Sequence, residues 1–313
     1  MNIGPGSPTS IDFGYGTKFP AKYQKALYLL DWTYSTIYAV HLSPHGSTYQ
    51  AISEDFVTGS PLPVTDAVIG KDGTMYFAVG GRGTQSAIYR VRYVGGDSVD
   101  PVPLSDPRGS NLRELRRQLE SFHGLHTAEG VSDSDLELVF QNLGNPDRFI
   151  RYAARIALEF QPVRRWRSRV LSLTEPMASI AGLLALARHG EPEDINAIAR
   201  GLLRLPPSDL DQHSQLAALR TLQVAFARRP DSAGQLQLEI QQQLLSLLES
   251  VYPTGTYPLD AEIVQLLVYL ESQVVVERTL ELMDQLGPEV TPDWGHLISR
   301  SEAYGGTVGA MLQ

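Results

Sequence analysis

The sequence predicts an α+β multidomain protein, with a β-rich first part followed by an all-α second part. Before about residue 96, short runs rich in Tyr, Val, Ile and Thr alternate with Gly, Pro, Ser and Asp, which is typical of strands and turns. From residue 111 onward, apolar residues recur at spacings of three and four, the period of an amphipathic helix. With 313 residues, the chain is long enough for two domains that each have a core.

The β part is expected to end near residue 94 and to contain six strands. An Asp72-Gly73 pair joins two of the apolar runs, and because both residues tolerate positive φ it predicts a tight hairpin there. The expected strands are 26–32, 36–42, 48–57, 64–70, 74–80 and 87–94.

A linker is expected at residues 95–110, which contain three prolines and show no periodicity. The all-α part, residues 111–313, begins with the amphipathic run NLRELRRQLESFHG, after which Ser132 predicts a helix N-cap. Short helices in series predict a solenoid, in which each helix pair buries its apolar face against its neighbours. The further helices are expected at 133–143, 147–160, 163–174, 177–189, 192–204, 209–228, 235–250, 259–271, 274–286 and 292–300.

The stretch PVTDAVIGKDGTMYFAVGGRGTQSAIYRV resembles one blade of the six-bladed propellers of the soluble quinoprotein glucose and sorbosone dehydrogenases. FGYGTKFPAKYQKALYLLDWTYSTIYAVHLSP, followed by that blade and by helical repeats, resembles the bacterial propeller–HEAT proteins with a membrane-bound dehydrogenase domain. The resemblance implies that residues 1–94 are C-terminal blades of a partial β-propeller. Because a blade has four strands, this part supplies about one and a half blades, and the chain is expected to be an internal fragment of a longer protein.

The segment NPDRFIRYAARIAL, residues 145–158, resembles the signature of HEAT repeats. This resemblance implies a HEAT-like α-solenoid over residues 111–313. It also implies that Asp147 and Arg151 form a polar ladder between repeats, while the small alanines of the segment permit close helix packing.

The glycine-rich stretch GGRGT, residues 80–84, is compatible with two roles. A phosphate cradle requires a helix directly after the glycines, whereas the AIYRVRYV that follows has the character of a strand. We therefore favour a turn between a strand ending near Val79 and one starting near Ala87, in which the glycines supply backbone freedom. The alternative is that Arg82 contacts an anionic ligand at the propeller mouth.

Seven arginines lie between Arg148 and Arg169, with Trp166 among them. One interpretation is an anion-binding or partner-binding patch in which an arginine stacks on the indole. The favoured interpretation is a solvated face, whose arginine stems cover apolar surface and whose charges pair with acids such as Glu159 and Glu175.

Candidate metal ligands are sparse. His123 and His126 are three residues apart and could meet on one helical face, but no third ligand is evident. Asp31 and Asp66 stand at strand boundaries, where a propeller can bind calcium, although Asp31 could equally cap a turn. Two further histidines, expected to pack or to face solvent, are His41 and His45.

Several functional classes are disfavoured by composition. The formal net charge of -9 argues against a sequence-independent nucleic-acid binder. The absence of cysteine excludes thiolate metal sites and C-x-x-C-H haem attachment within this chain. Neither a secretory signal nor a membrane-spanning run is visible, so no membrane span is expected. We assign no catalytic, cofactor-binding or metal-binding residue, and whether the chain is an enzyme stays open.

The expected function is that of a protein-interaction or scaffold module, whose partner is another protein or the missing domains of the same polypeptide. The alternative is that the chain forms part of an exported quinoprotein sugar dehydrogenase-like oxidoreductase, which passes electrons to a c-type haem domain absent from this chain. No cofactor is expected in this chain. The resemblance implies PQQ, calcium or c-type haem, and a periplasmic or exported location, for longer relatives.

Overall fold

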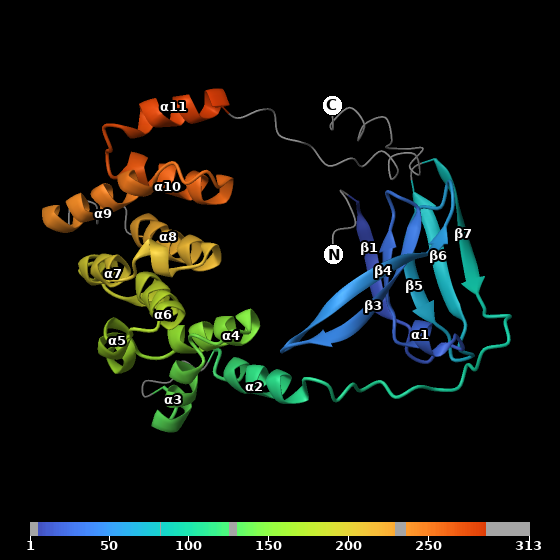
Figure 1. Cartoon of the computed structure of the whole chain (residues 1–313). Helices are drawn as coiled ribbons and strands as arrows, with labels where there is room; N and C mark the ends of the chain where they lie inside the picture. Colours follow the sequence, from blue (N-terminus) through green and yellow to red (C-terminus); the bar gives the residue numbers. More distant parts are fainter. Residues whose placement is uncertain (1–5, 82, 125–129, 229–235, 286–313) are drawn as a thin grey trace. The chain divides into compact units, whose positions relative to one another are not determined.

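The computed structural model describes residues 6–81, 83–124, 130–228 and 236–285, and these fall into two compact units that divide between Ser110 and Asn111 (Figure 1). The predicted mixed α+β content is confirmed. Two antiparallel sheets lie in the first unit, and the second unit is helical.

The first unit contains two sheets in which each strand pairs with its neighbour in sequence, in the orders β1-β2-β3-β4 and β5-β6-β7. β1 and the short helix α1 were not predicted from the sequence, because β1 is a largely exposed edge strand with a single large aliphatic residue and α1 has only four residues. The elements are β1 (Pro8–Phe13), α1 (Ala21–Gln24), β2 (Leu27–Asp31), β3 (Thr36–His45), β4 (Thr48–Thr58), β5 (Val64–Ile69), β6 (Met75–Gly81) and β7 (Thr84–Val91).

The core of this unit lies between the two sheets. Alternate residues of a strand point to the same face, so Tyr28 and Leu30 of β2 lie together with Ile37 of β3, and all three are fully buried. Met75 and Phe77 of β6 pack into the same cluster from the second sheet. Each large apolar side chain buried here contributes roughly 1.5–3 kcal/mol relative to its exposed form.

The segment after β7 is partly held by α1. Gln24 is buried, and its Nε2 donates to the carbonyl oxygens of Val99 at 3.2 Å and Asp100 at 2.9 Å. Its Oε1 accepts from the amide of Val102 at 3.2 Å. The segment predicted as a linker has no helix or strand before Ser110, but three of its backbone groups are fixed to the first unit, so its first half is not a free tether.

The second unit begins with α2, and the predicted helices are found within a few residues of their expected bounds. The helix predicted at 292–300 lies outside the described residues. The helical elements are α2 (Ser110–Glu120), α3 (Asp133–Gln141), α4 (Arg148–Glu159), α5 (Val163–Leu171), α6 (Pro176–His189), α7 (Asp194–Leu203), the 3-10 turn η1 (Pro207–Asp209), α8 (Gln212–Ala227), α9 (Leu238–Val251), α10 (Tyr257–Tyr269) and α11 (Val275–Gln285).

These helices pack in two rows within the unit. In one row α4, α6, α8 and α10 lie side by side, and in the other α5, α7 and α9 follow one another (Figure 1). α6 is the most enclosed, because Ile180, Leu183 and Leu186 together with its alanines are buried against helices on several sides. One apolar core therefore runs along the unit between the rows.

Side chains at the helix starts satisfy backbone amides that have no partner within the helix. Ser132 accepts from the amide of Asp135, as predicted, and Asp147 accepts from the amides of Phe149 and Ile150. Arg151 donates to the carbonyl of Asn145 at 2.5 Å and lies 3.4 Å from His213 of α8. The predicted ladder is therefore corrected in part: Asp147 caps its own helix, whereas Arg151 does approach another helix, α8, which lies beyond α6 in the chain.

Candidate functional site

The GGRGT stretch forms a tight hairpin. β6 runs to Gly81, which pairs with Thr84 at the start of β7, so both strands are longer at this end than the sequence predicted. A strand follows the glycines, so there is no helix N-terminus to hold a phosphate, and the predicted turn is confirmed. Gly81 has φ +149°, and a Cβ there would lie 2.6 Å from the ring of Trp32. Arg82 lies outside the described residues.

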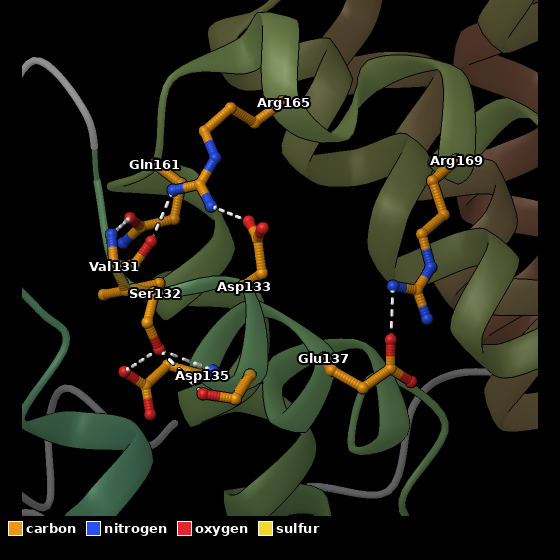
Figure 2. A network of polar contacts seen from close by, with 9 residues as sticks. Val131, Ser132, Asp133, Asp135, Glu137, Gln161, Arg165 and Arg169 are labelled. Carbon is orange, nitrogen blue, oxygen red and sulfur yellow. Dashed lines mark hydrogen bonds and ion pairs between the residues drawn. The ribbon is translucent and has the colours of Figure 1, made fainter.

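The arginine-rich segment forms a network between α3 and α5, shown in Figure 2. Arg165 donates to the carbonyl of Val131 and to Asp133 Oδ1. The amide of Val131 in turn donates to Gln161 Oε1 at 2.8 Å. These contacts fasten the start of α3 to α5, which is a structural role.

Other arginines of the segment also pair with acids. Arg169 contacts Glu137 Oε2 at 2.6 Å and lies over the ring of Phe140, and Arg167 contacts the buried Asp194 at 2.5 Å. The guanidinium of Arg169 lowers the pKa of Glu137 below its ordinary value, chiefly by hydrogen bonding. The favoured interpretation of acid pairing therefore holds for these arginines.

Two details of the arginine segment differ from expectation. Glu159 does pair, with Arg155 and Arg188, but Glu175 caps α6 by accepting from two backbone amides. Trp166 is fully buried, and its Nε1 donates to the carbonyl of Gln161 at 3.0 Å. The interpretation in which an arginine stacks on this indole in a surface patch is therefore wrong.

His123 packs against neighbouring groups, whereas His45 is exposed. His123 Nε2 lies 2.9 Å from the carbonyl oxygen of Ala153, and its ring stacks on Phe160. His126 lies outside the described residues. His45 is the last residue of β3. Within the ranges that the structure describes, no three His, Asp or Glu side chains gather in a way that could hold a metal ion.

His41 belongs to an exposed cluster around Glu54. Lys22 Nζ lies 2.7 Å from Glu54 Oε1, and His41 Nε2 lies 2.8 Å from the same oxygen. The hydrogen bond from Lys22, followed by that from His41, lowers the pKa of Glu54 to about 2. A carboxylate with so low a pKa is a poor general base near neutral pH, so this cluster ties α1 to the sheet.

Asp31 and Asp66 do not form a shared calcium site, because each makes its own local hydrogen bonds. Asp31 is fully buried, and its Oδ1 accepts from the amides of Tyr34 at 3.1 Å and Ser7 at 3.3 Å, which is the turn-capping role. Asp66 accepts from the hydroxyl of Ser10 at 2.7 Å on the surface. Asp31 Oδ2 has no hydrogen-bond partner among the described residues, but one such oxygen falls far short of the six to eight that calcium prefers.

An apolar cavity of about 720 Å³ was missed by the sequence analysis. It lies in the helical unit, between the end of α7, η1, α8, α9 and α10, and leucines dominate its walls. Uncharged polar groups also line it, at Ser208, Gln212, Gln215, Thr254 and Thr256. The only signal in the sequence is the pair Pro206-Pro207, which interrupts a leucine-rich stretch and keeps α7 and α8 from running together.

Among the described helices, none has both the length and the apolar character needed to cross a membrane. A comparison of the chain with protein-family models, with curated proteins and with solved structures found no match.

Proposed function

We propose that this chain is a protein-interaction module, built from a HEAT-like α-solenoid that follows C-terminal blades of a β-propeller. The two rows of neighbouring helices support the solenoid, because each helix packs against those one or two positions away. The four-stranded meander β1 to β4 supports the blades, since a propeller blade has this topology.

The observation that carries the proposal is an exposed apolar stripe on α11. Val276, Leu280 and Met283 are 66%, 59% and 63% exposed, and their spacing of four and three places them on one face of the helix. Exposed apolar residues that are grouped in this way mark interaction surfaces far more often than scattered ones do.

The charges beside the stripe indicate the chemistry of the partner. Glu277, Glu281 and Asp284 are exposed on the same helix. Its one cation, Arg278, is turned inward and donates to the carbonyl of Glu249 at 2.6 Å. The surface is therefore apolar with an acidic border, which complements an amphipathic helix that has basic flanks.

The test is affinity isolation with the whole chain as bait, comparing Leu280→Glu with Leu238→Glu. Both leucines are exposed, at 59% and 68%, so neither change should unfold the protein, and Leu238 on α9 lies outside the stripe. We expect one partner to bind the wild type and Leu238→Glu and to lose about 30-fold in affinity for Leu280→Glu, since a central apolar contact contributes about 2 kcal/mol. Equal binding of both variants would refute the proposal.

The alternative is that the β unit belongs to a quinoprotein-like oxidoreductase. One observation favours it: Val68 and Ile88, on the outer face of the second sheet, are exposed, as expected for a blade whose neighbour is supplied elsewhere. The alternative is tested on a longer protein of the kind that this chain resembles, by titration with PQQ in the presence of calcium. Sugar-dependent dye reduction there would favour the alternative, whereas no absorbance change and no reduction would count against it.

A further inference from the structure

The cavity of the helical unit has the size of a small-molecule site and lies apart from the stripe on α11. Its volume of about 720 Å³ falls in the range of roughly 300–1,000 Å³ that is typical of ligand pockets. Leu222 of α8, Leu244 of α9 and Ile263 of α10 line it from three helices, and each is almost fully buried. Protein interiors are close-packed, so an apolar space of this size gains dispersion contacts when a ligand fills it.

Among the residues that the structure describes, no charged side chain lines the cavity, so its walls favour an uncharged occupant. Its polar lining comes from η1 and the start of α8, with Ser208, Gln212 and Gln215, and from the residues just before α10, Thr254 and Thr256. α8 and α10 pack side by side, and Phe226 near the end of α8 stacks on Tyr269 at the end of α10, so the two helices run in the same direction and their starts lie at one end of the cavity. The remaining walls are apolar, which gives the cavity a polar end and an apolar body.

Two carboxylates stand at the polar end. Asp211 caps α8 and accepts from the amide of Ser214 at 2.8 Å. Hydrogen bonding to the side chain and backbone of Ser214 keeps the pKa of Asp211 below its ordinary value. Asp260 is buried in the first turn of α10 and accepts from the amide and hydroxyl of Thr254 at 2.7 and 2.8 Å. These acids already satisfy the amides that an anionic ligand would otherwise bind, and an anion would be repelled by them.

Two glutamine side chains lie at this end, and the amide group of only one of them, Gln212, is exposed. Gln215 Nε2 is occupied by the carbonyls of Pro207 at 2.9 Å and Leu210 at 3.0 Å. Gln212, in the first turn of α8, is exposed and presents both a donor and an acceptor. Such a group hydrogen-bonds a hydroxyl or a carbonyl oxygen equally well.

We propose that this cavity binds a neutral lipophilic small molecule that has an apolar chain and one uncharged polar end, such as a long-chain alcohol or ester. The chain occupies the leucine-lined body, and the polar end lies beside Gln212 at the starts of α8 and α10. This site is independent of the partner surface proposed for α11.

The test is titration of the whole protein with the neutral dye Nile red, followed by displacement with dodecanol or dodecanoate at pH 8. We expect saturable binding of one dye per protein, and displacement by dodecanol at a concentration at least about tenfold lower than by dodecanoate, which corresponds to about 1.4 kcal/mol. Absence of saturable binding overturns the site, and equal displacement by the carboxylate overturns the neutral head group.

A cavity-filling variant locates the bound dye. Ala218 lines the cavity, so Ala218→Phe should fill part of it and weaken Nile red binding by about tenfold or more, a loss of at least 1.4 kcal/mol. Ala227→Phe adds the same ring at the exposed end of α8, outside the cavity, and should bind as the wild type does. Thermal melts of both variants verify folding, and undiminished binding by a folded Ala218→Phe contradicts the proposed site.

Discussion

At the scale of single residues, the burial of Trp166 could not be predicted from the composition of its segment. It stands in a run of arginines and therefore looks like a surface residue, yet it is fully buried and hydrogen-bonded to the carbonyl of Gln161. Only its spacing of four from the buried Val170 reveals the inward face of α5. We expect Trp166→Ala to lower the free energy of unfolding by about 3–5 kcal/mol, measured by urea denaturation. Tyr152→Ala, at an exposed position of α4, should change it by about 0.5 kcal/mol or less.

Gly73 supports a second prediction at this scale. Its φ is +80°, and an added Cβ would lie 2.7 Å from Lys18 Cγ and 3.0 Å from the Lys18 backbone nitrogen. Gly83 has a similar φ of +72° but open space around it. Gly83→Ala should therefore cost only the backbone strain, about 1–2 kcal/mol, whereas Gly73→Ala should cost more because of the added clash. If chemical denaturation gave the same loss of unfolding free energy for both variants, Lys18 would have to move away from the added Cβ at no cost.

The Glu54 cluster predicts a pH dependence. The pKa of Glu54 is lowered to about 2, so its ion pairing stabilises the fold above the ordinary pKa of 4.5 and is lost as the pH falls toward 2. We expect Glu54→Gln to lower the melting temperature at pH 7, and this difference from the wild type should shrink between pH 4.5 and pH 2. The effect is small because the groups are exposed. A difference that is constant over this range would argue against the ion pair.

At the scale of elements, the helices were the most predictable part, because their apolar period spans several turns, whereas the exposed β1 carried almost no pattern. The cap of α4 illustrates the limit. Asp147 was expected in a ladder between repeats, but it accepts from the amides of its own helix at 2.9 and 3.4 Å. Which amide a side chain reaches depends on backbone geometry that the sequence pattern does not contain.

The cap gives a prediction for α4. Asp147→Ala should lower the free energy of unfolding by about 1 kcal/mol, since it leaves two amides without their acceptor. Asp147→Ser keeps a capping oxygen and should recover most of that loss. Thermal or urea unfolding of the two variants makes the comparison, and identical losses would mean that Asp147 acts through its charge.

At the scale of the whole molecule, the change from strands to helices could be predicted because the apolar period changes from two to about four. The cavity could not, since it depends on how four helices and a turn meet in space. The attachment of residues 99–102 to Gln24 was equally hidden, because it joins positions more than 70 residues apart.

That attachment predicts where a protease cuts. Residues up to Val102 are held against the first unit, whereas Arg108 follows them in an exposed stretch without helix or strand. Brief trypsin treatment should therefore cleave after Arg108 early in the digest, and mass spectrometry should find a fragment that begins at Gly109. Arg108→Gln should remove this product. If the bond between Arg108 and Gly109 stayed uncut, the residues around Arg108 would be protected from the protease.

The two rows of helices also bear on how such a chain can change over time. Each helix of the second unit contacts mainly those one or two positions away, so the contacts are local in sequence and little chain entropy is lost in forming them. A helix pair gained or lost beside α11, the last of the described helices, alters one interface and leaves the packing around α6 intact. The length of the array is therefore free to vary by duplication or deletion, while its central core is not.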